Sequence, residues 1–407
     1  MKLLDEIADI GRDERRGGYS RHVFDPHETR LRAWFIGHAE KLGLTVLPDG
    51  NGNLWAWWGN PGSGAVVTGS HLDSVPGGGA YDGPLGVASA LSAVSALAAV
   101  GERPSRPFAV VVFAEEEGSR FGRACLGSKL AAGQANPDVV RVLTDASGVT
   151  FADAAYAAGI DPGGLGPVRW AAEAACFVEL HVEQGRGLAD LGAPVAIATS
   201  ILAHGRWRLD FRGEGNHAGT TRMADRHDPV VAAARAVLAA RDLALAADTA
   251  SGGSGRGDSG GAARATVGRS EFVPGGTNVI ASRATVWLDC RAGDDTALAA
   301  LVAGITTAAR RAAHEEGCTV EMTEESALGR VDFDATLRDR IAGLLPGVPL
   351  LATGAGHDAG VLAALIPTAM LFVRNPSGIS HAPAEGASDA DCRAGAAALA
   401  TILRTLW

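Results

Sequence analysis

Residues 65–83 read AVVTGSHLDSVPGGGAYDG, and this stretch decides the fold class. It opens with a short apolar run, Ala65 to Thr68, which predicts a buried strand leading to His71. A glycine-rich turn follows and contains Asp82, and the uncharged run 86–100 then predicts a buried helix. A strand, a turn and a helix in this order are typical of an α/β protein with parallel strands.

Two further apolar runs end in polar residues. Residues 108–114 (FAVVVFA) are followed by three consecutive glutamates, 115–117, and residues 177–181 (FVELH) end at His181. Ligands of open α/β sheets bind beyond the carboxyl ends of the strands. We therefore expect His71, the glutamates and His181 to meet at one edge of the sheet.

The pattern changes at about residue 205. Residues 206–213 (RWRLDFRG) alternate as a half-exposed antiparallel strand does, and two helices (228–246 and 295–313) alternate with further strand-like runs. We predict a larger α/β domain with a mixed sheet flanked by helices, built from residues 1–204 and 323–407. An α+β, ferredoxin-like domain (205–322) is inserted between these two parts.

A glycine- and serine-rich stretch, residues 251–263, interrupts the inserted domain and predicts a loop. It contains GDSGG (257–261), which matches a serine-protease signature. No apolar strand leads into it and no histidine motif accompanies it, so we do not assign Ser259 as a nucleophile.

Composition excludes several classes of protein. The formal net charge of −10 argues against a nucleic-acid binder and against a membrane-surface protein. Five scattered cysteines with no CxxC pair argue against a disulfide framework and a cysteine-rich zinc site. Acids at positions 5 and 6 interrupt any apolar signal segment. We expect a soluble, cytoplasmic protein that binds neither nucleic acid nor membrane.

The polar residues at the predicted sheet edge are those of a metal site. A metal-bound imidazole commonly donates its second N–H to a carboxylate, and His71 and Asp73 have a suitable spacing. Clustered glutamates repel one another unless a cation neutralises them. With His381 from the loop SGISHAPAE (377–385), these histidines and carboxylates would suit two divalent ions, which can activate a water and polarise a carbonyl.

Together, and in this order, the motifs resemble the N-carbamoyl-L-amino acid hydrolase and allantoate amidohydrolase family. These are amidases of the hydantoinase/carbamoylase type, related to di-zinc aminoacylases and carboxypeptidases. The resemblance runs from NGNL (51–54) to the C-terminal histidine loop, and it includes GSRF (118–121), GNHAGTTRM (215–223), TNVI (277–280) and GAGHDA (354–359). It implies five metal ligands, with the aspartate bridging two ions: His71, Asp82, Glu117, His181 and His381.

The resemblance also implies roles for other residues. Glu116 would be the general base, Asp73 would support His71, and His217 would reach the partner subunit's site in a homodimer and stabilise the oxyanion. The residues implied to bind substrate are Gln184, Asn278, Arg291 and His357, the last without a defined role. Arg222 stands where the family usually has proline; it either alters specificity or is a solvated surface residue.

The function that the resemblance implies is hydrolysis of a linear ureido C–N bond with release of ammonia and carbon dioxide. Allantoate and N-carbamoyl-L-amino acids both fit, since each carries a carboxylate beside a ureido group. An aminoacylase or dipeptidase of the related peptidase branch remains an alternative, as does a non-catalytic binding protein on the same scaffold. The ligand set admits manganese, zinc, cobalt or nickel. Sequence does not decide the substrate, the native metal, the stereoselectivity, the pathway or the regulation.

Overall fold

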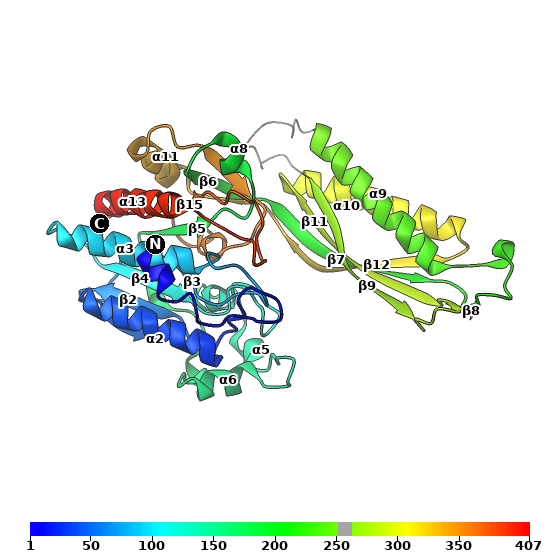
Figure 1. Ribbon diagram of the computed structural model, residues 1–407, viewed down its shortest axis with the longest axis horizontal. Helices are drawn as coiled ribbons and strands as arrows, with labels where there is room; N and C mark the ends of the chain where they lie inside the picture. Colours follow the sequence, from blue (N-terminus) through cyan, green and yellow to red (C-terminus); the bar gives the residue numbers. More distant parts are fainter. Residues whose placement is uncertain (251–262) are drawn as a thin grey trace. The chain divides into compact units, whose positions relative to one another are not determined.

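The computed structural model describes residues 1–250 and 263–407, which form two compact units (Figure 1). Unit 1 comprises Met1–Thr199 and Asp332–Trp407, and unit 2 comprises Ser200–Val331. The boundaries expected at 204/205 and 322/323 fall inside strands β7 and β12, because each of these strands continues past them. Most of the glycine-rich stretch 251–263, including Ser259, lies outside the described residues.

Unit 1 is built on a nine-stranded mixed sheet, with the order β1-β2-β4-β3-β5-β15-β6-β13 and with β14 paired to β6. The four strands β4, β3, β5 and β15 run parallel in its middle, and the pairs β2/β4 and β15/β6 are antiparallel. The strands are β1 (Thr45–Pro48), β2 (Leu54–Trp58), β3 (Val66–His71), β4 (Phe108–Phe113), β5 (Cys176–Val182), β6 (Val195–Ile201), β13 (Val331–Asp332), β14 (Leu350–Thr353) and β15 (Thr368–Val373).

The α-helices of unit 1 include the predicted 86–100 segment, with its ends shifted by one or two residues. The α-helices are α1 (Lys2–Asp5), α2 (Pro26–Lys41), α3 (Pro84–Ala99), α4 (Leu126–Ala131), α5 (Pro137–Arg141), α6 (Phe151–Ala157), α7 (Arg169–Ala172), α8 (Gly187–Leu191), α11 (Ala335–Leu344), α12 (Asp358–Leu362) and α13 (Asp389–Leu406). A single 3₁₀ turn, η1, covers Pro162–Gly164.

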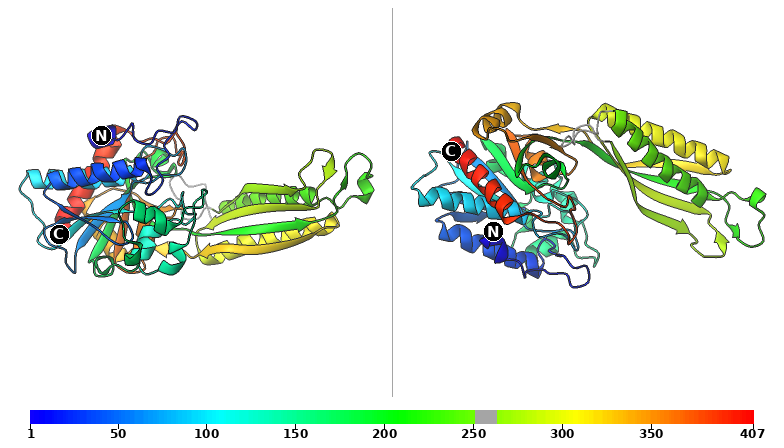
Figure 2. Two further views of the ribbon diagram at one scale, coloured as in Figure 1. Left: turned by 90° about the horizontal axis from the view of Figure 1, so that it is seen from below. Right: turned by 45° about the horizontal axis from the view of Figure 1, so that its top comes forward.

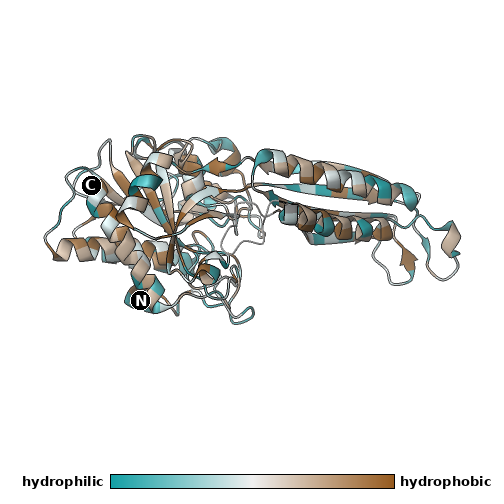
Figure 3. Ribbon diagram, turned by 90° about the horizontal axis from the view of Figure 1, so that it is seen from above, coloured by the Kyte–Doolittle hydropathy of each residue, from teal (hydrophilic) through white to brown (hydrophobic). Residues whose placement is uncertain are grey.

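The central strands are buried on both faces, which explains their near-continuous apolar sequences. Side chains alternate along a strand, so Val178 and Leu180 of β5 join the core under α3 and α13, while Glu179 and His181 project from the opposite face. The central strands are accordingly mostly brown in Figure 3. This alternation turns the polar groups of β5 away from the main core and toward α12.

Unit 2 has the βαββαβ order of a ferredoxin-like unit, with the sheet order β12-β7-β11-β9. The two long helices α9 and α10 lie side by side along one face of this sheet (Figure 2), over a core that includes Leu209, Phe211 and Leu288. Its elements are β7 (Ala203–Arg212), β8 (Asn216–His217), η2 (Met223–Asp225), α9 (Pro229–Ala250), β9 (Arg264–Val273), β10 (Val279–Ile280), β11 (Arg283–Ala292), α10 (Asp295–Glu315) and β12 (Thr319–Leu328).

Within the described ranges, none of the helices combines the length and the apolar character that crossing a membrane requires.

Candidate active site

Four parallel strands bring the predicted site of unit 1 together at their carboxyl ends. His71 is the last residue of β3 and pairs in register with Phe113 of β4, which leads into the glutamates. His181 lies near the end of β5 and pairs with Phe372 of β15, whose chain continues toward His381. The expectation that these groups meet at one edge of the sheet is therefore met.

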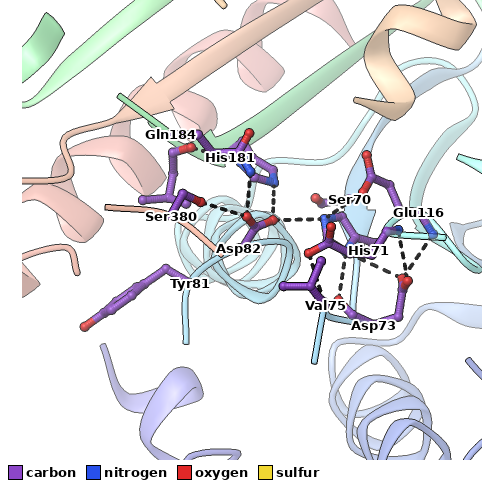
Figure 4. Close-up of polar contacts among 12 residues, drawn as sticks. Ser70, His71, Asp73, Val75, Tyr81, Asp82, Glu116, His181, Gln184 and Ser380 are labelled. Atoms are coloured by element: carbon purple, nitrogen blue, oxygen red, sulfur yellow. Dashed lines mark hydrogen bonds and ion pairs between the residues drawn. The ribbon is translucent and has the colours of Figure 1, made fainter. Parts of the chain in front are cut away.

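Asp82 is the centre of the site and is almost fully buried (Figure 4). Its Oδ1 lies 3.2 Å from Nε2 of His181 and 3.5 Å from Nε2 of His71. Its Oδ2 faces the other way, 3.5 Å from Nε2 of His381, which is also 3.4 Å from Oε2 of Glu117. The five residues thus form two three-residue groups that share one carboxylate.

Both strand histidines are oriented by their second ring nitrogen. Nδ1 of His71 donates to the backbone carbonyl of Asp73 at 3.0 Å, and Nδ1 of His181 donates to the carbonyl of Val182 at 2.9 Å. When the ring is neutral, this leaves Nε2 as the acceptor, and neither Nε2 has a hydrogen-bond partner. Imidazoles held in this tautomer are prepared to bind a metal ion.

Asp73 positions both His71 and the turn that carries the glutamates. Its Oδ1 accepts the backbone N–H of Glu116 at 3.2 Å, and its Oδ2 accepts that of Glu117 at 3.0 Å. The Asp73 carboxylate also lies 3.5 Å from Nδ1 of His71. One buried side chain therefore links the first histidine to the expected base and to the expected ligand.

The two glutamates of the site both have raised pKa values. Burial raises the pKa of Glu117 to about 8, and Asp82 adds to the shift. Burial also raises the pKa of Glu116 well above its usual value, although His71 opposes this. Among the described residues, no Arg or Lys forms an ion pair with these carboxylates.

The histidines shift in the complementary direction. Burial by itself would lower the pKa of His181, but Asp82 outweighs burial and raises it to about 9. Likewise, burial would raise the pKa of Asp82, yet His181 and His71 hold it well below its usual value. Without metal ions, protons on these imidazoles neutralise the negative charge of the carboxylates. Divalent cations would provide the same neutralisation, and the unpartnered Nε2 atoms and the carboxylate oxygens are suitable ligands for such ions.

Two of the expected substrate-binding residues lie in unit 1. Nε2 of Gln184 donates to Oδ2 of Asp82 at 2.6 Å and lies 3.2 Å from Nε2 of His381. His357 is buried with its ring 4.5 Å from the ring of His181, and its Nε2 has no partner. Burial and the neighbouring His181 both lower the pKa of His357, so this imidazole is neutral.

The other two expected substrate-binding residues, Asn278 and Arg291, lie in unit 2 together with His217. His217 and Asn278 line one hollow of about 510 Å³ beside the paired strands β8 and β10. Arg291 lies eight residues along β11 from Arg283, the end nearest to Asn278, and pairs with Asp289. Eight strand residues span roughly 26 Å. A small substrate therefore does not contact Arg291 and Asn278 of the same subunit.

Several residues escaped sequence analysis. Glu385, which follows His381 by four residues, accepts the backbone N–H of Asp82 at 3.0 Å. Glu179 accepts a hydrogen bond from Ser70 and the N–H of Ala359, which fixes the start of α12 beside His357. An acid inside an apolar strand run, as in FVELH, is the signal that could have identified Glu179.

Arg222 is 81% exposed in its side chain and pairs with Asp225 at 2.6 Å, so its contacts are those of a surface residue.

Comparison with known proteins agrees with this geometry. The model of peptidase family M20/M25/M40 matches residues 67–405. The chain is 34% identical to N-carbamoyl-L-amino acid amidohydrolase of Geobacillus stearothermophilus, covering 99% of this chain and 96% of the relative. It is 32% identical to allantoate amidohydrolase of Escherichia coli (strain K12), covering 100% and 97%.

A solved structure gives the same result. The hydantoinase/carbamoylase family amidase from Burkholderia multivorans superimposes with a TM-score of 0.85 at 30% identity, covering 100% of this chain and 97% of that one. The resemblance inferred from the motifs is therefore confirmed. The predictions that the chain is an enzyme and that it has an α/β fold are confirmed with it. The chain belongs to peptidase family M20/M25/M40 and, within it, to the amidohydrolases that act on C–N bonds.

Proposed function

We propose that the enzyme hydrolyses the C–N bond of a linear ureido compound that carries a carboxylate, with release of ammonia and carbon dioxide. The observation that carries this proposal is Asp82, which is shared between two groups of metal-ligand type and lies beside the buried Glu116. The relatives named above act on N-carbamoyl-L-amino acids and on allantoate, which both meet this description. Overall resemblance does not separate these two substrates, since the chain is 34% identical to the first relative and 32% identical to the second.

The proposed ligands are His71, Asp82 and His181 for one ion, and Asp82, Glu117 and His381 for the other. Divalent ions at these positions would polarise the ureido carbonyl and acidify a water molecule. Manganese, zinc, cobalt and nickel all suit the donor set.

Glu116 is the proposed general base. Its carboxylate lies 3.6 Å from Nε2 of His71 and accepts a weak hydrogen bond from the thiol of Cys125 at 3.4 Å. Burial outweighs the opposing effect of His71 and raises the affinity of Glu116 for a proton, which suits a group that takes a proton from water and returns it to the leaving nitrogen. Asp73 positions this carboxylate through the backbone of the turn.

We infer that the active enzyme is a homodimer in which His217 and Asn278 act at the partner subunit's site. The separation of roughly 26 Å along β11 supports this, because Arg291 of one subunit and Asn278 of the other can then approach one substrate. His217 is exposed, and its Nδ1 accepts the N–H of Gly219 at 3.0 Å, so Nε2 carries the proton. This N–H is the proposed donor to the oxyanion.

Mixing two inactive variants tests the shared site. His217→Ala and Glu116→Gln each disable every site of their own homodimer. In a hybrid dimer, one active site contains both substitutions and the other contains neither. Random re-association should therefore restore about a quarter of the wild-type activity. A mixture that stays as inactive as its components would contradict a site built from two subunits.

Ammonia release from the manganese-loaded enzyme identifies the substrate. Allantoate and an N-carbamoyl-L-amino acid are assayed side by side, with Glu116→Gln as the matched catalytic control. Loss of turnover in this variant with unchanged metal content supports the base assignment, and unchanged turnover refutes it. Inactivity on both substrates would favour the alternative, an aminoacylase or dipeptidase of the related branch.

We place the enzyme in the cytoplasm because all five cysteines are free thiols and four of them are buried, which suits a reducing compartment.

A further inference from the structure

Glu385 joins the two loops that carry metal-ligand candidates in unit 1. Its Oε1 accepts the backbone N–H groups of Tyr81 and Asp82, both at 3.0 Å. Its Oε2 accepts the hydroxyl of Ser380 at 3.0 Å. Glu385 is only 6% exposed, so these hydrogen bonds are shielded from solvent.

The glycine-rich turn is shaped around this carboxylate. A Cβ atom at Gly79 would lie 2.2 Å from Oε1 of Glu385 and 2.5 Å from its Cβ. Any larger residue at position 79 would displace the Glu385 side chain. The close approach therefore indicates that the glycine-rich turn packs specifically against the loop that carries Glu385.

The hydroxyl of Ser380 has one proton to donate and lies close to two acceptors. Its Oγ lies 3.0 Å from Oε2 of Glu385 and 3.2 Å from Oδ2 of Asp82. A serine hydroxyl can donate to only one of them at a time. Nε2 of Gln184 already donates to one lone pair of Oδ2 on Asp82. When Ser380 donates to Glu385, the other lone pair of this oxygen remains available to an ion.

We propose that Glu385 is a positioning residue that directs the Ser380 hydroxyl away from Asp82 and so secures the ion held by Asp82, Glu117 and His381. This inference rests on the two-ion site of the proposed function. The ion held by His71, Asp82 and His181 depends less on Glu385, because its histidines belong to β3 and β5. His381, in contrast, lies in the Ser380 loop with a positive φ of 55°, a conformation that its surroundings must maintain.

Glu385→Gln tests this direction of the hydrogen bond. The amide oxygen can still accept the N–H groups of Tyr81 and Asp82, so the turn keeps its contacts. The amide N–H₂ then faces Ser380, whose hydroxyl must turn and donate to Oδ2 of Asp82. We expect the second zinc ion to bind about 10- to 100-fold more weakly, with the first ion little changed.

Titration of zinc into the metal-free enzyme, with bound zinc counted by elemental analysis, measures both steps. Wild-type enzyme that binds fewer than two ions per subunit would contradict the proposed site itself. Two ions in the wild type and two equally tight ions in Glu385→Gln would contradict this inference alone. Parallel weakening of both ions would also contradict it.

Glu183→Gln is the matched control. Glu183 is also 6% exposed and also accepts two backbone N–H groups, those of Gly187 and Leu188, at the start of α8. Its contacts as described include none of the five proposed ligands. We expect this variant to retain both zinc affinities, whereas selective loss of the second ion here would overturn the specific role of Glu385.

A double-mutant cycle separates positioning from a general structural role. In a Ser380→Ala background there is no hydroxyl to redirect, so Glu385→Gln should weaken the second ion by less than about threefold. An equal loss with and without the Ser380 hydroxyl would refute the proposed route through this hydroxyl.

Discussion

Replacing Asp73 by asparagine should disable catalysis without unfolding the enzyme. Asp73 is 1% exposed, and each of its two oxygens accepts one backbone N–H, from Glu116 and from Glu117. Asparagine has one carbonyl oxygen, so its N–H₂ group must face one of these donors. A buried donor without an acceptor costs about 1–3 kcal/mol. If the turn moves to relieve this conflict, the base and a ligand move with it, and we expect a 10- to 100-fold loss of kcat or of zinc affinity.

Asp49→Asn provides the control for this experiment. Oδ1 of Asp49 accepts the N–H groups of Asn51 and Asn53, and Oδ2 accepts the indole N–H of Trp55 at 3.0 Å. Asparagine creates the same conflict between donors there, in the turn after β1. Urea denaturation, zinc content and ammonia release are measured for both variants. Equal losses of stability together with wild-type kcat and zinc content in Asp73→Asn would refute the reasoning.

Removal of the ions should destabilise the enzyme more at high pH. Because the pKa of Glu117 is raised to about 8 and that of His181 to about 9, the metal-free folded state holds protons that the unfolded chain has released. The stability of the metal-free state therefore falls as the pH rises from about 5 toward 9, and a chelator-induced drop in Tm that is constant across this range would contradict the assignment. Gly86→Ala should cost about 1–3 kcal/mol in chemical denaturation, since its Cβ would lie 2.2 Å from the carbonyl oxygen of Leu180. Gly37→Ala, in α2 with open space around the Cβ position, should instead stabilise the enzyme by about 0.5–1 kcal/mol, and a loss at this position would be unexpected.

The sheet edge was predictable because its signals are local. An apolar run that ends in a polar residue marks both a strand and the place where that strand delivers a side chain. His71, Glu117 and His181 all follow this rule, and their meeting requires only that β3, β4 and β5 run parallel. The insertion was predictable for a similar reason, since the change from continuous to alternating apolar residues distinguishes a buried strand from a half-exposed one.

Contacts between distant segments were not predictable. Glu385 contacts Asp82 across a sequence separation of 303 residues, and no periodicity relates the two positions. Three acids in a row usually face water, so the sequence favours a solvated position for Glu115 over a direct role in the site. The structure buries it completely, and it accepts the N–H groups of Arg120 and Phe121.

The glycines of the turn after β3 show how local and distant requirements coincide. From the sequence, PGGGAYDG predicts a turn because glycine tolerates unusual backbone angles. Gly83 does adopt a positive φ of 81°, but a Cβ there would also lie 2.5 Å from the ring of His71. Gly79 has no positive φ, and its lack of a side chain makes room for Glu385. The glycines are therefore needed because the histidine and the buried glutamate approach Asp82 through the space that side chains would occupy, and the turn conformation alone does not explain them.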